Sequence, residues 1–481
     1  MQSFNIQSLS ALLAQYPPYL QKHELEQRLA DALAKNKQKI VVLDDDPTGT
    51  QTVHDVCVYT DWSVESITDA FEDSHSMFFI LTNSRSFTVE QTIAAHKEIA
   101  HNLAAASKKT GVSYLVVSRG DSTLRGHYPL ENQVLRTALE AEGAPRLDGD
   151  IIFPFFPEGG RYTAGNIHYV ADADALTPVG KTEFARDKTF GFSSSDLCDW
   201  IEEKSGGEFK SNDVTCITLD CLRALDYSKI EAQLLAVTGF GKVIVNALTY
   251  EDVKVFVTAL MSVLAKGKHF MFRTAAAFVN VIGGISDQPL LTHFISQKSG
   301  RGGLVIAGSH VKKTTAQLDA LSTLPDLEMI TLDQHLVLDS VAFEAEQQRV
   351  LRLCEKAISA GRTTVVMTRR ERLDLNTGSK EDELHIATKI SDALTGIVSG
   401  LSIAPSFLVA KGGITSSDIA CKGLLIKKAL VAGQIRPGVP VWFTAEESRF
   451  PGIPYIIFPG NVGTSEDLKI VVQLLNEQTK P

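Results

Sequence analysis

The residues of this sequence best suited to chemistry lie in one short segment, residues 118–127, directly after the apolar run 114–117. The segment reads SRGDSTLRGH and combines an acid, two arginines, hydroxyl side chains and two glycines. Glycine lets the backbone approach a ligand closely, and guanidinium groups match the geometry of carboxylate or phosphate. We therefore predict a site for a small, anionic, hydroxylated ligand. If this loop is considered alone, the alternative interpretation is a salt-bridged turn that binds no ligand.

Three consecutive aspartates, Asp44, Asp45 and Asp46, follow a second apolar run at residues 39–43. Adjacent carboxylates at a strand end repel one another, so this arrangement is costly unless a cation, a proton or a polar ligand offsets it. One of them could act as general base toward a substrate hydroxyl, and another could bind magnesium. The alternative is that one aspartate caps the next segment while the others are solvated.

Two more apolar runs, at residues 77–81 and 150–153, lead into loops that carry Arg85 and Arg161. Helical patterns separate the four runs, at about residues 64–73, 88–108 and 129–142. Alternating strands and helices predict a parallel sheet covered by helices, and such sheets bind ligands outside the carboxyl ends of their strands. All four polar clusters follow predicted strands, so we expect them to converge on one crevice.

The second half of the chain contains three apolar runs that lead into turns rich in glycine and hydroxyl residues, each followed by a helical pattern. These turns are residues 308–310, 411–418 and 459–465. Free backbone N–H groups at a helix N-terminus favour an anion. One such turn is often only a cap, but three predict a site for a nucleoside triphosphate. The sequence has no GxxxxGK[ST] string and no GxGxxG after a strand, which argues against a P-loop kinase and a dinucleotide fold.

The length of 481 residues is too great for one ordinary core. Turn-forming residues are concentrated near residues 285–302, which predicts a boundary there. We expect an α/β protein of two domains, residues 1–290 and 291–481. Each domain is predicted to be a mainly parallel sheet flanked by helices, with the active site in the cleft between them.

Composition restricts the partners and the compartment. The formal net charge of −10 and the pI near 5.7 argue against a nucleic-acid-binding surface. No apolar run approaches the roughly 18–20 residues needed to cross a bilayer. The six cysteines are scattered without a CxxC pair, as expected of free thiols in a reducing compartment. We therefore expect a cytoplasmic protein with no nucleic-acid or membrane partner.

The motifs resemble those of the four-carbon acid sugar kinase family, long catalogued as a domain family of unknown function. Residues 45–50, DDPTGT, are similar to the family's DDxTGA element, and residues 121–126 carry its DSTLRG string. Residues 160–163, GRYT, are similar to its GRTT-like loop, and the likeness continues through residues 184–187 into the C-terminal half. The resemblance thus covers most of the chain in the family's order.

This chain departs from the commonest family pattern at three positions near the expected substrate end. It has the additional Asp44, Pro47 in place of an aliphatic residue, and Arg119 where a lysine is frequent. In the C-terminal half, the family often has an acid where Ile414 stands.

The resemblance implies that residues 1–290 form a sugar-acid-binding domain and residues 291–481 a nucleotide-binding domain. It also implies phosphorylation of acids such as threonate, erythronate or their oxo forms. The positions implied to contact ATP are Ser309, Gly412, Gly413, Ile414, Thr415, Gly460 and Gly463.

We therefore expect an ATP-dependent sugar-acid kinase, a phosphotransferase with an alcohol group as acceptor. Asp45 or Asp46 would accept the hydroxyl proton or help bind Mg²⁺, which bridges the ATP phosphates and neutralises developing charge. Arg125 and Arg161, with Arg119 as a third candidate, would hold the substrate carboxylate. The expected substrate site is completed by Arg85, Asp121 and Ser122.

Two other classes of function remain as alternatives. The first is a nicotinamide-dependent sugar-acid oxidoreductase, against which the missing GxGxxG counts. The second is a non-catalytic sugar-acid-binding or effector protein, which would need only one of the two predicted sites. The expected partner is a small-molecule sugar acid, and a homodimer is a possible assembly.

Overall fold

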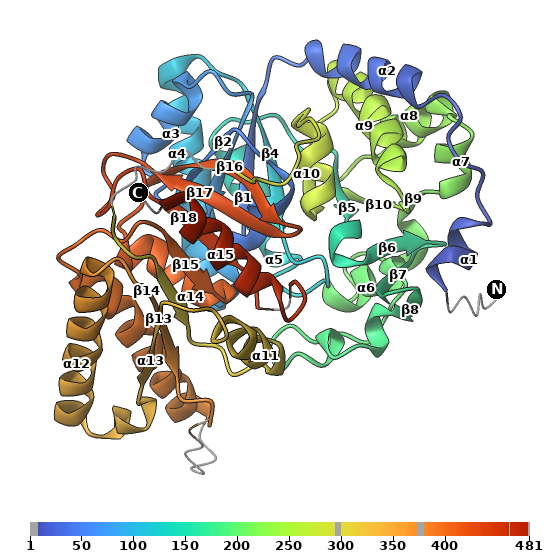
Figure 1. Cartoon of the computed structure of the whole chain (residues 1–481). Coiled ribbons are helices and arrows are strands. Elements are labelled where there is room, and N and C mark those ends of the chain that lie inside the picture. Colours follow the sequence, from blue (N-terminus) through green and yellow to red (C-terminus); the bar gives the residue numbers. More distant parts are fainter. Residues whose placement is uncertain (1–7, 294–299, 372, 374–379, 461, 480–481) are drawn as a thin grey trace. The chain divides into compact units, whose positions relative to one another are not determined.

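The computed structural model describes residues 8–293, 300–371, 373, 380–460 and 462–479, so part of the predicted boundary segment, residues 294–299, lies outside the described residues. The chain divides into two compact units (Figure 1). The first unit comprises Met1–Gly49 and Asp61–Ser286, and the second comprises Thr50–Thr60 and Asp287–Pro481. Each has a mainly parallel sheet flanked by helices, which confirms the predicted fold class.

The large sheet of the first unit is parallel, in the order β3-β1-β4-β11-β5-β10-β9. Its strands are β1 (Lys39–Asp44), β3 (Met77–Leu81), β4 (Tyr114–Arg119), β5 (Gly149–Phe153), β9 (Thr215–Ile217), β10 (Gly241–Val245) and β11 (Phe270–Thr274). Strands β1, β3 and β5 are buried at every position. A parallel sheet is covered on both faces, which explains why uninterrupted apolar runs mark these strands in the sequence.

Helices cover this sheet in two groups. The crossovers β3-α4-β4 and β4-α5-β5 move in one direction along the strand order, whereas those through α8 and α9 move in the other. Because such crossovers are right-handed, the two groups lie on opposite faces. The helices are α1 (Leu9–Leu13), α2 (Lys22–Ala34), α3 (Val64–Glu72), α4 (Val89–Thr110), α5 (Leu130–Ala141), α6 (Leu197–Lys204), α7 (Leu219–Arg223), α8 (Tyr227–Ala236), α9 (Tyr250–Ala265) and α10 (Ala276–Ile282).

A small antiparallel sheet follows β5 and consists of β6 (Arg161–Ala164), β7 (Ile167–Asp172) and β8 (Ala175–Pro178). The backbone N–H of Thr163 donates to the carbonyl oxygen of Ala247 at 3.1 Å, and the N–H of Ala247 donates back at 3.0 Å. Ala247 lies just beyond the carboxyl end of β10, so this pairing attaches the small sheet to the carboxyl edge of the large one.

The sheet of the second unit has the order β13-β14-β12-β15-β18-β17-β16-β2 and is parallel from β13 to β18 and antiparallel beyond. The strands are β2 (Val56–Tyr59), β12 (Leu304–Ala307), β13 (Leu327–Leu332), β14 (Thr363–Thr368), β15 (Leu408–Lys411), β16 (Lys428–Arg436), β17 (Val439–Thr444) and β18 (Pro454–Phe458). The indole Nε1 of Trp442 donates to Thr50 Oγ1 at 2.9 Å. This bond and the pairing of β2 with β16 attach Thr50–Thr60 to the second unit.

The helices of the second unit are α11 (Lys312–Leu321), α12 (Ser340–Ser359), α13 (Lys380–Gly400), α14 (Gly413–Asp418) and α15 (Asp467–Thr479). The last helix begins at Asp467, whose Oδ2 accepts hydrogen bonds from the N–H and hydroxyl of Thr464, at 2.6 and 3.1 Å, and holds the preceding turn. Across all the helices of the described residues, none is both long enough and apolar enough to pass through a bilayer.

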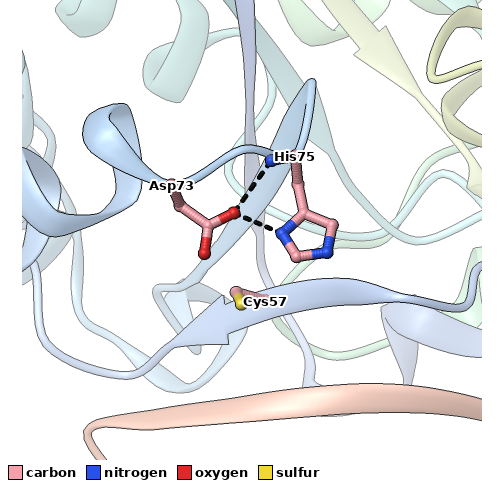
Figure 2. A group of neighbouring side chains, drawn as sticks. All are labelled: Cys57, Asp73 and His75. Carbon is pink, nitrogen blue, oxygen red and sulfur yellow. Dashed lines mark hydrogen bonds and ion pairs between the residues drawn. The ribbon is translucent and has the colours of Figure 1, made fainter.

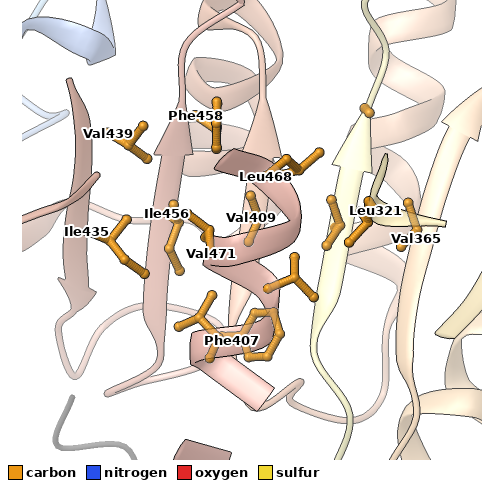
Figure 3. Close-up of a cluster of buried hydrophobic side chains, with 14 of the residues drawn as sticks. Leu321, Val365, Phe407, Val409, Ile435, Val439, Ile456, Phe458, Leu468 and Val471 are labelled. Atoms are coloured by element: carbon orange, nitrogen blue, oxygen red, sulfur yellow. The ribbon is translucent and has the colours of Figure 1, made fainter. Parts of the chain in front are cut away.

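The core of the second unit lies between its parallel strands and the helices α11 and α15 (Figure 3). Val409 and Ile456 are register neighbours on β15 and β18, and both belong to a fully buried cluster with Leu321 of α11 and Val471 of α15. Packing of this kind fixes the strands whose carboxyl ends carry the glycine-rich turns.

Leu321→Ala should destabilise the second unit by about 2–5 kcal/mol, because it removes buried methyl groups and leaves a cavity. Leu321 is 0% exposed, whereas Leu338 is 66% exposed. Leu338→Ala is therefore the matched control and should change the free energy of unfolding by less than about 0.5 kcal/mol. Urea unfolding of the two variants measures the difference, and equal effects would contradict the assignment of this core.

Candidate functional site

The three aspartates lie at the carboxyl end of β1, between β3 and β4. Asp44 is in register with Leu81 of β3 and with Arg119 of β4, so the polar segments that follow these strands begin at the same level. Asp44 and Asp45 are 1% and 4% exposed. A Cβ at position 49 would lie 1.9 Å from Oδ2 of Asp44, so the turn after the aspartates requires Gly49.

Arginines from the neighbouring strands pair with these carboxylates. Arg85 donates from Nε and Nη2 to the two carboxylate oxygens of Asp45, at 3.1 and 2.6 Å, and from Nη1 to Asp46 at 3.2 Å. Arg119, itself 4% exposed, donates from Nη1 to Asp44 Oδ1 at 3.2 Å. The predicted substrate ligands Arg85 and Arg119 therefore serve first as partners of the aspartates.

The aspartates differ in their electrostatic environment. Burial and the charges of Asp45 and Asp46 raise the pKa of Asp44 to about 7, although Arg119 opposes the shift. Burial also raises the pKa of Asp45, against the opposing charges of Arg85 and Arg119. Asp46 instead forms a local turn, in which its Oδ1 accepts hydrogen bonds from the N–H and hydroxyl of Thr48 at 2.8 and 2.6 Å. The capping alternative thus describes Asp46 but not the other two.

The loop after β4 is organised by Asp121. Its carboxylate accepts hydrogen bonds from the N–H of Thr123 at 3.2 Å, from the Thr123 hydroxyl, and from Nε of Arg125 at 2.7 Å. Burial alone would raise the pKa of Asp121, but the guanidiniums of Arg85 and Arg125 hold it below its usual range. Leu124, between them, is 0% exposed and belongs to a buried cluster, which anchors the loop.

Arg125 and Arg161 meet at one aromatic ring. Their guanidinium carbons lie 5.1 and 5.5 Å from the ring centroid of Phe184. Cation–π contacts of this kind hold an arginine without occupying all its N–H donors. Phe184 lies in the segment that carries the family resemblance, but the sequence alone did not indicate this role.

His168 of β7 connects the small sheet to the loop after β4. Burial lowers its pKa to about 4, and the charges of Arg161 and Arg273 act in the same direction. The neutral ring can donate from Nε2 to the carbonyl oxygen of Ser122 at 2.8 Å while Nδ1 accepts from Thr163 Oγ1 at 2.9 Å. His168 was not predicted from the sequence, and its hydrogen bond fixes the backbone of the predicted ligand Ser122.

A fifth arginine, Arg273 at the end of β11, also lies in this cluster and was not predicted. It is 3% exposed and donates from Nη2 to the carbonyl oxygen of Arg125 at 2.9 Å. Residues 270–273 have the same pattern as the other strands, an apolar run followed by a polar residue, so the signal was present.

Three buried arginine nitrogens in this cluster have no hydrogen-bond partner among the described residues. They are Nε of Arg119, Nε of Arg161 and Nη1 of Arg273. Buried donors are rarely left unpaired in proteins. The cluster therefore combines paired carboxylates with spare cationic donors, which suits an anionic ligand bearing hydroxyl groups.

The second unit brings together the turns after β12, β15 and β18. A Cβ at Gly308 would lie 3.5 Å from Thr415 Oγ1, and the N–H of Gly412 donates to the carbonyl oxygen of Phe458 at 2.9 Å. Gly412 has a φ of +118°, which glycine adopts without strain. Apart from its chain neighbours, no atom of the described residues lies within 4 Å of a Cβ built at Gly460.

Lys411, at the end of β15, is a buried cation that sequence analysis did not assign. It is 0% exposed, and its Nζ donates to the carbonyl oxygens of Pro459 and Gly460 at 2.5 and 3.2 Å. Burial lowers its pKa to about 7, and the charge of Lys313 acts in the same direction. Lys411 thus links the turns after β15 and β18.

The remaining predicted nucleotide positions differ in their surroundings. The Ser309 hydroxyl accepts a hydrogen bond from the N–H of Val311 at 3.3 Å, and the Ile414 side chain is 66% exposed. Gly463 lies in the turn held by Asp467, where a Cβ would lie 2.9 Å from Asp467 Oδ2. Residue 461, in the same predicted loop, lies outside the described residues. The nucleotide roles of these positions stay predictions.

Asp73 and His75 make a separate contact at the amino end of β3. The Asp73 carboxylate accepts from the N–H of His75 at 2.9 Å and is hydrogen-bonded to its ring Nδ1 (Figure 2). Because the residues discussed above follow the carboxyl ends of the strands, this contact stands apart from the candidate site.

Asp44→Asn should stabilise the protein more at pH 8 than at pH 5. The folded-state pKa of about 7 exceeds the ordinary value of 3.8, so between these values the folded protein holds a proton that the unfolded chain releases. Stability therefore falls as the pH rises through this range, and the cost of the ionised carboxylate is fully present above it. Asparagine has no such cost. The stabilisation by Asp44→Asn should therefore be larger at pH 8 than at pH 5 by an amount on the order of 2 kcal/mol.

Urea unfolding at the two pH values measures this effect. Asp172→Asn, at an exposed position of the same unit, is the matched control. A stability change in Asp44→Asn that does not depend on pH would contradict the burial of an ionisable Asp44.

Comparisons with solved structures agree with this fold. The chain resembles a Salmonella typhimurium LT2 protein provisionally described as a tRNA synthase, at 16% identity and a TM-score of 0.61, over 90% of this chain and 98% of that one. It also resembles a Haemophilus influenzae protein assigned to a domain family of unknown function, at 17% identity and a TM-score of 0.59, over 90% and 99%. At these identities the likeness concerns the fold alone. No curated protein matches the chain.

Family models match both halves of the chain. Residues 40–282 match a family described as a sugar-binding N-terminal domain. Residues 304–468 match one described as a nucleotide-binding C-terminal domain. The first match alone spans half of the sequence, and the coarse form of the expected family is thereby confirmed. The chain belongs to the family whose members combine a sugar-binding N-terminal domain with a nucleotide-binding C-terminal domain.

Proposed function

We propose that this protein is an ATP-dependent kinase that phosphorylates a hydroxyl of a four-carbon sugar acid of the threonate, erythronate or oxo-tetronate type. The observation that carries the proposal is the cluster of aspartates and arginines at the carboxyl edge of a sugar-binding domain. A nucleotide-binding domain in the same chain supplies the second requirement of a kinase. Residues 1–290 and 291–481 are the proposed domains for the two substrates.

The arginines are proposed to hold the substrate carboxylate. Arg125 and Arg161 both contact the ring of Phe184. Among the described residues, Nε of Arg161 and Nε of Arg119 have no hydrogen-bond partner. A carboxylate would satisfy such donors, and two planar guanidiniums would fix its orientation. Arg85, Asp121 and Ser122 would complete the site by holding the acidic cluster and the loop in place.

Asp45 or Asp46 is proposed as the catalytic carboxylate. Either could accept the proton of the attacking hydroxyl, provided that the substrate hydroxyl comes within hydrogen-bond reach. The same carboxylates are hard oxygen donors of the type that Mg²⁺ prefers, so the residues present fit this ion. Mg²⁺ bound with ATP would neutralise charge that develops during transfer.

The turns of the second unit are proposed to bind ATP. Gly412, Gly413 and Thr415 stand at the start of α14, and Lys411, which precedes them, is hydrogen-bonded to the carbonyl oxygen of Gly460. Lys411 adds a buried positive charge beside them. Ser309, Ile414 and Gly463 are the further proposed contacts. Cytoplasmic location and a homodimer also remain proposals that follow from the sequence.

Binding of ATP with Mg²⁺ should raise the thermal unfolding midpoint of the protein, because a ligand of the native state stabilises it by mass action. NAD should have no effect, because the chain carries no GxGxxG turn after a strand. Thermal shift followed by calorimetry tests both. Binding of NAD without ATP would favour the oxidoreductase alternative, and binding of a sugar acid without any nucleotide would favour a non-catalytic protein.

Asp45→Asn and Asp46→Asn test the acidic cluster. At least one of them should lower kcat by about 10² or more while the protein stays folded, because asparagine is not a base and is a weaker ligand for Mg²⁺. The assay is ADP release with a panel of four-carbon acids. Asp172→Asn is again the control. Turnover equal to the wild type in both cluster variants would overturn the proposed role.

A further inference from the structure

Two adjacent residues of β11, Arg273 and Thr274, connect this strand to the two ends of the loop after β4. At the start, the N–H of Gly120 donates to the carbonyl oxygen of Thr274 at 3.0 Å. At the far end, Nη2 of Arg273 donates to the carbonyl oxygen of Arg125 at 2.9 Å. The loop between these bonds carries Asp121, so β11 holds the whole segment by two adjacent residues.

Gly120 is the position that allows Arg273 to reach the loop. A Cβ at residue 120 would lie 2.9 Å from Cζ of Arg273 and 3.0 Å from both terminal nitrogens. Real Cβ atoms essentially never lie closer than 3.0 Å to a non-bonded heavy atom, so a side chain at residue 120 would require the guanidinium or the loop to shift. The glycine in this loop therefore serves the packing of an arginine from a distant part of the sequence.

The other terminal nitrogen of Arg273 is spare. The whole residue is only 3% exposed. Its Nη1 is buried and has no hydrogen-bond partner among the described residues. The charges that act on Arg273 include those of Asp45, Asp121 and Arg85, which belong to the candidate site. Buried donors are rarely left without an acceptor, and the described residues supply none for this nitrogen.

We infer that Arg273 is a specificity-determining residue that holds the loop of residues 120–126 with one nitrogen and donates to the substrate carboxylate with the other. The contact with the substrate carboxylate rests on the proposed function. The loop-holding role concerns the protein without ligand and does not depend on that proposal. The planar fork of a guanidinium can serve two acceptors at fixed positions at once, which a single ammonium cannot do.

The experiment compares Arg273→Gln, Arg273→Lys and Gly120→Ala with the wild type. In the absence of ligand, hydrogen–deuterium exchange of residues 120–126 should be faster in Arg273→Gln and Gly120→Ala. With erythronate and threonate as probes, the KM of the acid should rise roughly tenfold or more in both Arg273 variants, because a charged hydrogen bond is lost. The kcat at saturating acid and the affinity for ATP should change little.

Arg136→Lys is the matched control. Arg136 lies on α5, pairs with Glu140 at 3.2 Å and stacks over Phe240, so neither the loop nor the KM should respond to its replacement. Gly120→Ala leaves Arg273 itself in place, which keeps the test decisive if Arg273→Gln does not fold.

The exchange and kinetic measurements test the two proposed roles of Arg273 separately. Unchanged exchange of residues 120–126 in Gly120→Ala and the Arg273 variants would overturn the loop-holding role. Wild-type KM for the acids in both Arg273 variants would overturn the carboxylate contact. If the wild type neither binds nor phosphorylates any four-carbon acid, the proposed function fails, and with it the carboxylate contact. The exchange data then still decide whether Arg273 holds the loop.

Discussion

The candidate site depends on the burial of like charges at one end of a parallel sheet. Asp44 and Asp45 are adjacent and nearly inaccessible, which in isolation would be unfavourable because both desolvation and mutual repulsion oppose ionisation. Arginines from the two flanking strands offset this cost. The bidentate pair of Arg85 with Asp45 and the buried pair of Arg119 with Asp44 are the contacts that make the cluster tolerable.

The parallel topology makes this compensation geometrically possible. The strands β3, β1 and β4 are neighbours in register. The residues that follow these strands therefore meet at the same edge of the sheet, although dozens of positions separate them in the sequence. Close backbone approach completes the arrangement: Gly49 makes room for the Asp44 carboxylate, and Gly120 makes room for Arg273. Glycines in these loops can thus make room for buried charged side chains as well as for a ligand. A glycine-rich loop is therefore ambiguous evidence for binding when only the sequence is known.

The sequence was sufficient to predict β1, β3, β4 and β5 and the helices between them, but not β6, β7 and β11, which carry Arg161, His168 and Arg273. The apolar run at residues 77–81 has the same bounds as β3, because a strand that is buried at every position consists of apolar residues. The partners of each arginine were not predictable, because a sequence carries no strand order. Arg85 and Arg119 were predicted as substrate ligands, but which carboxylate each one pairs with follows only from the neighbours of β1. His168 was missed because its contact depends on a segment 46 residues away. The strand of Arg273 does show the apolar pattern, but the partner of this arginine lies 148 residues away.

The assignment of Thr50–Thr60 to the second unit illustrates the same limit. This segment follows the aspartate turn directly, yet β2 pairs with β16 and Thr50 bonds to Trp442, far along the chain. Nothing local in its sequence distinguishes a strand of one sheet from a strand of another, because both require the same buried apolar residues.

The two units manage buried charge in different ways. In the first unit, carboxylates are buried against guanidiniums, and three arginine nitrogens have no hydrogen-bond partner among the described residues. In the second, the ammonium of Lys411 is buried against backbone carbonyls of the loop after β18, and burial, together with the charge of Lys313, lowers its pKa to about 7. An isolated buried cation favours its neutral form until an anion comes near. Both arrangements therefore sacrifice stability in the free protein, and both would recover part of it from an anionic ligand, as expected where a protein is shaped by binding rather than by stability alone.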